Sequence, residues 1–352
     1  MNQAMLSILD GIKFNAPTHA RRIFDIQLAN QPELDEMYDE RQRRLSIEDI
    51  EYHLQFLAEA MMVGKPELYG DYMAWTRVVL ESRNVPTKYL KSNIKIIDHY
   101  IDQEGLLSGD FDKRIFFDAA LRALEVPYQE PPAHIDFDAN HGQLAKSYLE
   151  LVLGGFRKAA IQLIMDAVEG GIPIKDVLLE VLQPVQHEIG RLWQVNEISV
   201  AKEHYCTAIA QQVIAMLYPR MFDVPSNGLK MIGASVDAEL HEMGIRMVTD
   251  FFEMEGWETT YLGARTPVQS IIAMVEEEKP DVVALSATMM DHVTTIKRTI
   301  AGIREVVGRD TKVIVGGYPF NVVPGLWQEL DADGYSNSAT GAVELGRKLV
   351  GR

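Results

Sequence analysis

Residues 229–244 read L-K-M-I-G-A-S-V-D-A-E-L-H-E-M-G, and this stretch decides the fold of the C-terminal part of the chain. It predicts a short apolar strand, a polar loop and then a helix that begins near His241. Five alternating strand–helix units predict a parallel sheet that is covered by helices on both faces. Ligands of such sheets bind outside the carboxyl ends of the strands. The predicted strands are Leu229–Ala234, Thr259–Leu262, Val282–Leu285, Val313–Val315 and Gly334–Tyr335.

The rest of the chain has helical periodicity, and two proline-containing stretches divide it. Residues 125–140 predict a linker, and residues 218–228 predict a second break. Residues 1–124 predict a helical domain, with helices at Ile47–Met62, Pro66–Glu81, Thr87–Gln103 and Lys113–Leu124. Residues 141–220 predict an antiparallel four-helix bundle, because the connections are short. Its predicted helices are Gly142–Leu153, Phe156–Glu169, Ile174–Trp193 and Ser199–Leu217. The fold class is therefore α plus α/β, with the α/β domain at 229–352.

Composition excludes several classes of protein. The 352 residues include 34 Lys and Arg against 51 Asp and Glu, a formal net charge of −17. So acidic a chain is a poor candidate for nucleic-acid binding on its own, since counterion release needs clustered cations, although a local basic patch is not excluded. The single cysteine, Cys206, permits no intrachain disulfide and fits a reducing cytoplasm. We also expect no secretory signal and no membrane span, since no apolar run reaches about 18 residues.

A histidine and several small or polar residues gather at the predicted carboxyl ends of three strands. A histidine at such an edge can ligate a metal, and a carboxylate two residues away can accept its second N–H. A glycine in the first helical turn permits a bulky ligand to approach. Taken singly, each residue is also explained by ordinary helix starts and strand-end turns. The residues are Glu239, His241 and Gly244, then Ser286 and Thr288, then Gly316 and Gly317.

In combination these residues resemble the cobalamin-binding domain. Its pattern is an acidic residue, one residue, His, two residues, Gly, then Ser-x-Leu, then Gly-Gly; here Glu239 replaces the usual Asp, and Thr288 the usual Leu. The resemblance covers about 229–352 and implies a Rossmann-like, flavodoxin-type sheet. It also implies that His241 is the lower axial ligand to cobalt, in place of the dimethylbenzimidazole tail. The tail would lie in a slot beside Gly316 and Gly317, in contact with Ser286.

A second motif lies in the predicted bundle, where Trp193 is followed by nine residues and then Glu203-His204. By itself it is explained by a core tryptophan and a surface Glu-His pair. Beside the cobalamin pattern it resembles the cap of the adenosylcobalamin-dependent photoreceptors, the CarH-like group. The resemblance implies that Trp193 packs over the adenosyl group and that Glu203 and His204 reach it. Gln194 stands where that group can carry a histidine that captures cobalt after illumination, so a bis-histidine product is not expected unless His187 or His204 substitutes.

The N-terminal part resembles a globin-like helical domain of bacterial cobalamin-binding sensors, on the segments Tyr52–Ala60, Tyr69–Trp75 and Leu80–Leu90. Leu80 occupies the place of a proximal histidine, so iron ligation is not expected, and His19, His53 and His99 are more simply structural or surface residues. The order of the three parts is similar to that of the photocobilins, which pair cobalamin with biliverdin. That similarity implies a non-covalent bilin, because Cys206 lies in the cap. Its candidate contacts are Tyr72, Trp75 and Arg83, of which the two aromatic residues are also explained as core.

The function that we expect is a light sensor without catalytic activity. It would bind adenosylcobalamin and signal to an unidentified effector protein through cap movement or a change of homo-oligomeric state. The alternative is a corrinoid methyl-carrier protein that serves a methyltransferase, since such carriers share the cobalamin domain and a helical cap. A radical mutase needs a barrel of about 250 residues, for which 1–124 is too short. No DNA-binding signature stands out there either, so the repressor role of the CarH-like proteins is not expected.

Overall fold

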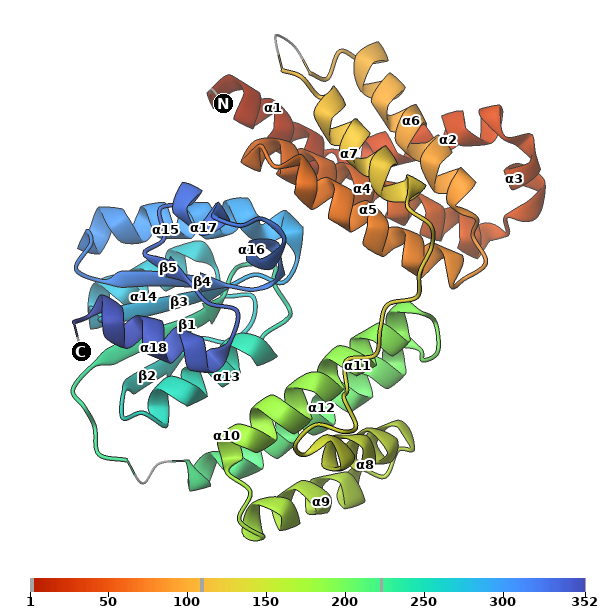
Figure 1. Cartoon of the computed structure of the whole chain (residues 1–352). Coiled ribbons are helices and arrows are strands. Elements are labelled where there is room, and N and C mark those ends of the chain that lie inside the picture. The colour runs from red at the N-terminus through yellow and green to blue at the C-terminus, as the bar shows by residue number, and fades with distance from the viewer. Residues whose placement is uncertain (1–2, 108–110, 222–223, 352) are drawn as a thin grey trace.

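The computed structural model describes residues 3–107, 111–221 and 224–351. Figure 1 shows an N-terminal helical part and an α/β part side by side, with the long helices α11 and α12 of a middle helical part extending beneath them. The break predicted at 218–228 includes residues 222 and 223, which lie outside the described residues. Within the described ranges no helix is long and apolar enough to cross a bilayer.

The α/β part is built on a five-stranded sheet in which all strands are parallel, in the order β2-β1-β3-β4-β5. This is the flavodoxin-type order, so the predicted sheet is confirmed. The register sets Ser235 beside Ser286, and Ser286 beside Gly316, at the carboxyl edge. The strands are β1 (Lys230–Ser235), β2 (Glu258–Tyr261), β3 (Val282–Ser286), β4 (Lys312–Gly316) and β5 (Gly334–Tyr335).

Alternate strand residues enter two separate apolar cores, because successive side chains of a strand point to opposite faces. Ile232 and Val283 belong to a core that continues into the N-terminal helical part, whereas Met231 and Val282 belong to one that continues into the middle part. The sheet is thus joined to each helical part through a buried cluster. The surrounding helices are α13 (Met243–Glu253), α14 (Val268–Glu278), η3 (Met290–His292), α15 (Val293–Val307), α16 (Tyr318–Val322), α17 (Leu326–Glu329) and α18 (Ala339–Leu349).

The middle part has helical stretches where the sequence predicts them. One of them contains a π-helical segment, η1, which the sequence did not reveal. The Ser199 hydroxyl accepts the backbone N–H of Lys202 and so caps the last long helix, which brings Glu203 into its first turn. The elements are α8 (Gly142–Leu153), α9 (Arg157–Glu169), α10 (Ile174–Asp176), η1 (Val177–Leu182), α11 (Gln183–Gln194), α12 (Val200–Leu217) and η2 (Tyr218–Arg220).

The N-terminal part is helical, as expected. Its longest helix begins earlier than predicted, because Asp39 and Gln42 form a reciprocal capping box, and it ends at Gly64, whose φ of +73° suits glycine. Three helices before it had no predicted bounds. The helices are α1 (Gln3–Phe14), α2 (Ala16–Asn30), α3 (Pro32–Met37), α4 (Glu40–Val63), α5 (Pro66–Glu81), α6 (Thr87–Gln103) and α7 (Arg114–Glu125).

Candidate cofactor-binding site at the carboxyl edge of the sheet

Glu239 is the centre of a hydrogen-bonded cluster in the loop between β1 and α13. Its side chain is fully buried, and its carboxylate accepts five hydrogen bonds. Oε1 accepts the backbone N–H of His241 at 2.9 Å and Nδ1–H of the same residue at 2.6 Å. Oε2 accepts the backbone N–H groups of Thr288 (2.6 Å) and Met289 (2.9 Å) and Nδ1–H of His292 (3.2 Å). The cluster therefore ties the loop after β1 to the loop after β3.

The charge of Glu239 fixes the tautomer of His241. Burial acts to raise the pKa of Glu239, but the hydrogen bonds from His241, His292 and the backbone outweigh it and hold that pKa well below its usual range. An ionised carboxylate only accepts hydrogen bonds, so Nδ1 of His241 carries the proton. The lone pair of the neutral ring is then on Nε2.

The His241 imidazole is available to a ligand. Its side chain is 58% exposed although its partner Glu239 is buried. The hydrogen bond to Glu239 raises the pKa of His241, burial opposes this, and the negative charge of Glu239 adds to the rise. An oriented, basic and exposed Nε2 is what a metal ligand needs. The neighbouring Leu240 is also exposed, so the loop presents an apolar side chain as well as the imidazole.

His292 is a member of the cluster that the sequence analysis missed. Burial acts to lower the pKa of this ring, but the hydrogen bond to Glu239 and the charges of Asp291 and Glu239 outweigh burial, so the pKa of His292 is raised. Nε2 of His292 lies 3.7 Å from Oδ1 of Asp291. The sequence carries a signal for it: Met290–His292 follow the loop after β3, at the carboxyl edge of the sheet where such sheets bind ligands, four residues beyond Thr288 in the case of His292.

The other predicted loop residues lie at the same edge. Ser286 and Thr288 are half-buried, and across the described ranges their hydroxyls make no hydrogen bond. Gly317 has a φ of +105°, and a Cβ there would lie 1.9 Å from the carbonyl oxygen of Ala287. Glycine is therefore required at 317 for the loops after β3 and β4 to approach each other. At Gly244 a Cβ would meet no atom within 4 Å, so the first turn of α13 presents open space.

The middle part contributes α12 to the same region. Glu203 lies close enough to His241 for its negative charge to raise the pKa of that imidazole. The Glu203 carboxylate also accepts the Thr207 hydroxyl at 2.9 Å and forms a hydrogen bond with Nδ1 of the exposed His204 ring. Further along α12, Nε2 of Gln211 donates to Glu242 at 3.0 Å, which ties α12 to the start of α13. The structure thus brings Glu203 and His241 to one region.

Trp193 contacts the N-terminal part. Its ring stacks obliquely on Trp75, with centroids 5.9 Å apart, and the Arg83 guanidinium lies 5.5 Å from its centroid. The Gln194 side chain donates to the backbone carbonyl of Trp75 at 3.4 Å. Two of the three residues proposed for a bilin, Trp75 and Arg83, therefore contact α11.

Tyr72 lies elsewhere, in the core of the N-terminal part. It stacks on Phe56 with ring centroids 3.9 Å apart, and its hydroxyl bonds to Nδ1 of His53 at 2.9 Å. Burial lowers the pKa of His53 to about 3, so this ring is neutral and structural. Tyr72 therefore faces α4, whereas Trp75 and Arg83 face α11.

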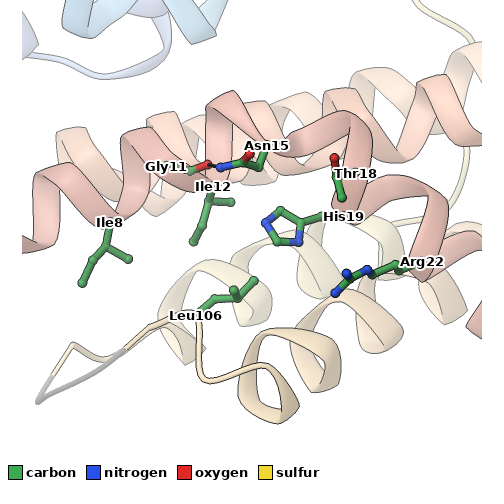
Figure 2. Close-up of a pocket in the computed structure, with 8 residues that line it drawn as sticks. All are labelled: Ile8, Gly11, Ile12, Asn15, Thr18, His19, Arg22 and Leu106. Atoms are coloured by element: carbon green, nitrogen blue, oxygen red, sulfur yellow. Dashed lines mark hydrogen bonds between the residues drawn. The ribbon is translucent and has the colours of Figure 1, made fainter.

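Two cavities involve the N-terminal part. Figure 2 shows one of about 370 Å³, where Ile8 and Ile12 of α1 and His19 of α2 face Leu106. The second, of about 440 Å³, lies along α5 and α7 and includes Arg77 among its lining residues. Neither is lined by Tyr72, Trp75 or Arg83.

The remaining cap candidates have structural partners. His187 packs edge-on against His134 at 5.5 Å between ring centroids, and burial lowers its pKa. Cys206 is buried in the apolar core of the middle part. Its position supports the earlier inference that a bilin in the N-terminal part could not use it.

Comparison with known proteins gives the cofactor class. Residues 229–344 match a family model described as a B12 binding domain, and residues 144–218 match a second model with the same description. The chain therefore contains cobalamin-binding domains, in agreement with the resemblance drawn from Glu239 and His241. The matches support a cobalamin-binding family for this chain.

Curated relatives fall into two groups at similarly low identity. A corrinoid protein of Desulfitobacterium hafniense is 25% identical over 58% of this chain and 95% of its own length. The transcriptional repressor CarH of Myxococcus xanthus is 28% identical over 44% of this chain, which spans about half (51%) of that repressor. The solved structure of the Methanosarcina barkeri monomethylamine corrinoid protein superposes with a TM-score of 0.53 at 18% identity, covering 60% of this chain and all of that one. This likeness shows the fold alone.

The described residues fit a corrinoid. One exposed imidazole nitrogen is oriented by a buried carboxylate, as cobalt ligation requires. Among the described residues, the hydroxyls of Ser286 and Thr288 at the same edge make no hydrogen bond within the protein. These features lie on two neighbouring strands, at the edge where α/β sheets bind their ligands.

Proposed function

We propose that this protein is a light sensor that binds adenosylcobalamin, with His241 as the protein ligand to cobalt. The observation that carries the proposal is the contact of the cap helix α12 with the residue that follows His241: Nε2 of Gln211 donates to Glu242 at 3.0 Å, and Glu203 lies on the same helix, near enough for its charge to act on His241. A carboxylate on the cap helix suits a cofactor that carries ribose hydroxyls and an adenine amine, since these donate hydrogen bonds. A methyl group offers no such donor.

The residues of this chain have separate roles in the proposal. His241 holds cobalt through Nε2, and Glu239 keeps the proton on Nδ1 and stabilises the oriented ring. Ser286, Thr288, Gly316 and Gly317 border the slot for the nucleotide tail.

In the cap, Trp193 supplies a flat apolar wall, and Glu203 with His204 binds the polar atoms of the adenosyl group. When bound, the cofactor would supply a cobalt–carbon bond that visible light can break. The chain itself would then act as a sensor and not as an enzyme, signalling through cap position or homo-oligomeric state to an effector protein. Size-exclusion chromatography of the loaded protein in darkness and after green light tests that output, and an unchanged elution volume would exclude a change of assembly state.

The test of the adenosyl assignment is a comparison of two cofactors. Glu203→Ala should weaken adenosylcobalamin binding about tenfold, the order expected for lost hydrogen bonds to a charged group, and leave methylcobalamin binding unchanged. Glu197→Ala, at an exposed turn residue before α12, is the matched control. Equal losses for both cofactors in the Glu203 variant would contradict the assignment.

The second candidate is a corrinoid methyl carrier. It is favoured by the relative from Desulfitobacterium hafniense, which is called a corrinoid protein and is matched over 95% of its length. Tighter loading with methylcobalamin than with adenosylcobalamin, together with methyl transfer in the presence of a methyltransferase, would support this candidate against the sensor.

For the N-terminal part we propose non-covalent biliverdin as a second chromophore, on the resemblance to the photocobilins alone. Because Trp75 and Arg83 contact α11, a bilin held by them would lie next to the cap. Reconstitution with biliverdin should give a far-red absorption band. On a denaturing gel the pigment should migrate as free biliverdin, separate from the protein, because it is not covalently attached. An unchanged pigment spectrum on mixing would remove this part of the proposal and leave the cobalamin part intact.

A further inference from the structure

The C-terminal end of α11 is capped by the N-terminal part. Arg83 donates from Nη1 to the carbonyl of Gln194 at 3.0 Å and from Nη2 to the carbonyl of Trp193 at 3.1 Å. The Ser82 hydroxyl donates to the same Gln194 carbonyl at 3.1 Å. The last carbonyls of a helix lack partners within it and carry partial negative charge, so a guanidinium is a favourable cap. Arg83 therefore fixes the backbone that carries Trp193.

The same guanidinium also restrains the Trp193 ring. It lies over that ring, and the Trp75 indole packs obliquely against it, so two groups of the N-terminal part contact the ring. These groups are partly exposed: Trp75 is 39% exposed and Arg83 is half-buried. Contacts of exposed polar groups are weak, since water competes for them, so this contact can open without unfolding either part.

A second contact joins the N-terminal part to the sheet, and it is of the opposite kind. Glu59 of α4 is only 1% exposed and accepts the backbone N–H of Thr294 at 2.6 Å and its hydroxyl at 3.0 Å, at the first turn of α15. Lys13 pairs with Glu59 at 2.9 Å and donates to the carbonyl of Asp291 at 2.6 Å. A buried charged group with several partners is costly to separate.

These two contacts connect the N-terminal part to both sides of the candidate site. The Glu59 contact lies on the segment that contains His292, which bonds to Glu239 on the sheet side. The Arg83 contact lies on Trp193, on the cap side. One contact is buried and charge-assisted, and the other is partly exposed.

We propose that Arg83 is a positioning residue for Trp193 and that the N-terminal part detects the position of the cap through it. The Glu59 contact anchors the N-terminal part to the sheet, while the Arg83–Trp193 contact is released when the cap moves. This inference rests on the proposed function, in which Trp193 packs over the adenosyl group and the cap moves when that group leaves.

Hydrogen–deuterium exchange of the full chain tests the inference in two arms. In the apo protein kept in darkness, Arg83→Gln should raise amide exchange about tenfold at residues 190–200, as expected for loss of a cap, and leave residues 290–297 unchanged. Glu59→Ala should do the reverse. Arg114→Gln, which changes an exposed arginine at the start of α7 that forms an ion pair with Asp112, is the matched control. Far-UV circular dichroism verifies that each variant is folded.

In the adenosylcobalamin-loaded protein, green light should raise exchange at residues 75–83 and 190–200 in the wild type and add little in Arg83→Gln. Arg83→Lys keeps the charge but not the two-pronged geometry, so it should restore only part of the light-dependent difference.

Two outcomes would overturn the inference: unchanged exchange at residues 190–200 in dark Arg83→Gln, or an absorbance change on illumination without any change at residues 75–83. The absence of any absorbance change would instead count against the proposed function, and the dark arm would still decide the role of Arg83.

Discussion

The Glu239 cluster at the carboxyl edge of the sheet and the Trp193 contact at the end of α11 are built in different ways. The Glu239 side chain is fully buried, and its carboxylate oxygens accept five hydrogen bonds at 2.6 to 3.2 Å. The Trp193 contact joins residues 110 positions apart through partly exposed side chains. Buried charge-assisted hydrogen bonds are stronger than partly exposed ones. The difference indicates a rigid sheet side that orients a ligand and a cap side that can be displaced.

His241→Ala should have the largest effect, since it removes the proposed cobalt ligand. We expect cobalamin affinity to fall by about a hundredfold or more, with an absorption spectrum that no longer indicates imidazole coordination. Spectrophotometric titration measures both quantities. His99→Ala, at an exposed position in the N-terminal part, is the control. Unaltered affinity and spectrum in the His241 variant would disprove the axial assignment.

Glu239→Gln should have the next largest effect. The amide keeps the size of the side chain but loses the charge that holds the proton on Nδ1, so cobalamin affinity should fall between about tenfold and a hundredfold. The pKa of His241, measured by NMR, should fall at the same time, because its largest raising influence is the hydrogen bond to Glu239. An unchanged His241 pKa would mean that the cluster does not control this ring.

Glu59→Ala tests the anchor on the sheet side. It leaves the Thr294 N–H and the Lys13 ammonium without their shared acceptor, so the free energy of unfolding should fall by about 2 kcal/mol. Urea denaturation of the variant against the wild type measures the loss. If the free energy of unfolding changes by less than about 0.5 kcal/mol, the Glu59 contact is no anchor, and the contrast with the releasable Arg83–Trp193 contact is lost.

The dependence of cobalamin binding on pH should be the smallest effect. The pKa of His241 is raised, and only the neutral ring has a lone pair on Nε2 for cobalt. Affinity should therefore be constant above that pKa and decrease by up to about tenfold per pH unit as the pH falls below it. Titrations at several pH values measure the slope. His241→Ala should remove the slope, and a slope of the opposite sign in the wild type would contradict the tautomer assigned to the ring.

The sheet side could be predicted from the sequence because its signals are local. Glu239 and His241 are two positions apart on one loop. Ser286 and Gly316 were predicted because ligands of parallel sheets bind at the carboxyl ends of the strands, and the register places these two residues side by side. The sheet itself followed from alternating apolar strands and helices. His292 was missed although the same rule covered its loop.

The cap side could not be predicted in the same way. The contacts of Trp193 with Trp75 and Arg83 depend on how two helical parts pack, and no local pattern encodes that arrangement. The early helices were also difficult to delimit, because the buried stripe of α2 begins with Ala16 and Ala20, which carry a weak hydrophobic signal. The helical spacing of apolar residues does not distinguish a short π-helical segment from an α-helix, so η1 before α11 could not be predicted either.

The most direct test of the proposed function is the absorption spectrum of the adenosylcobalamin-loaded full chain before and after green light. We predict a red-orange protein whose spectrum changes irreversibly on illumination, and we predict that the dark spectrum of His241→Ala lacks the features of imidazole coordination. A wild-type spectrum that is the same before and after green light would contradict the account of this protein as a light sensor.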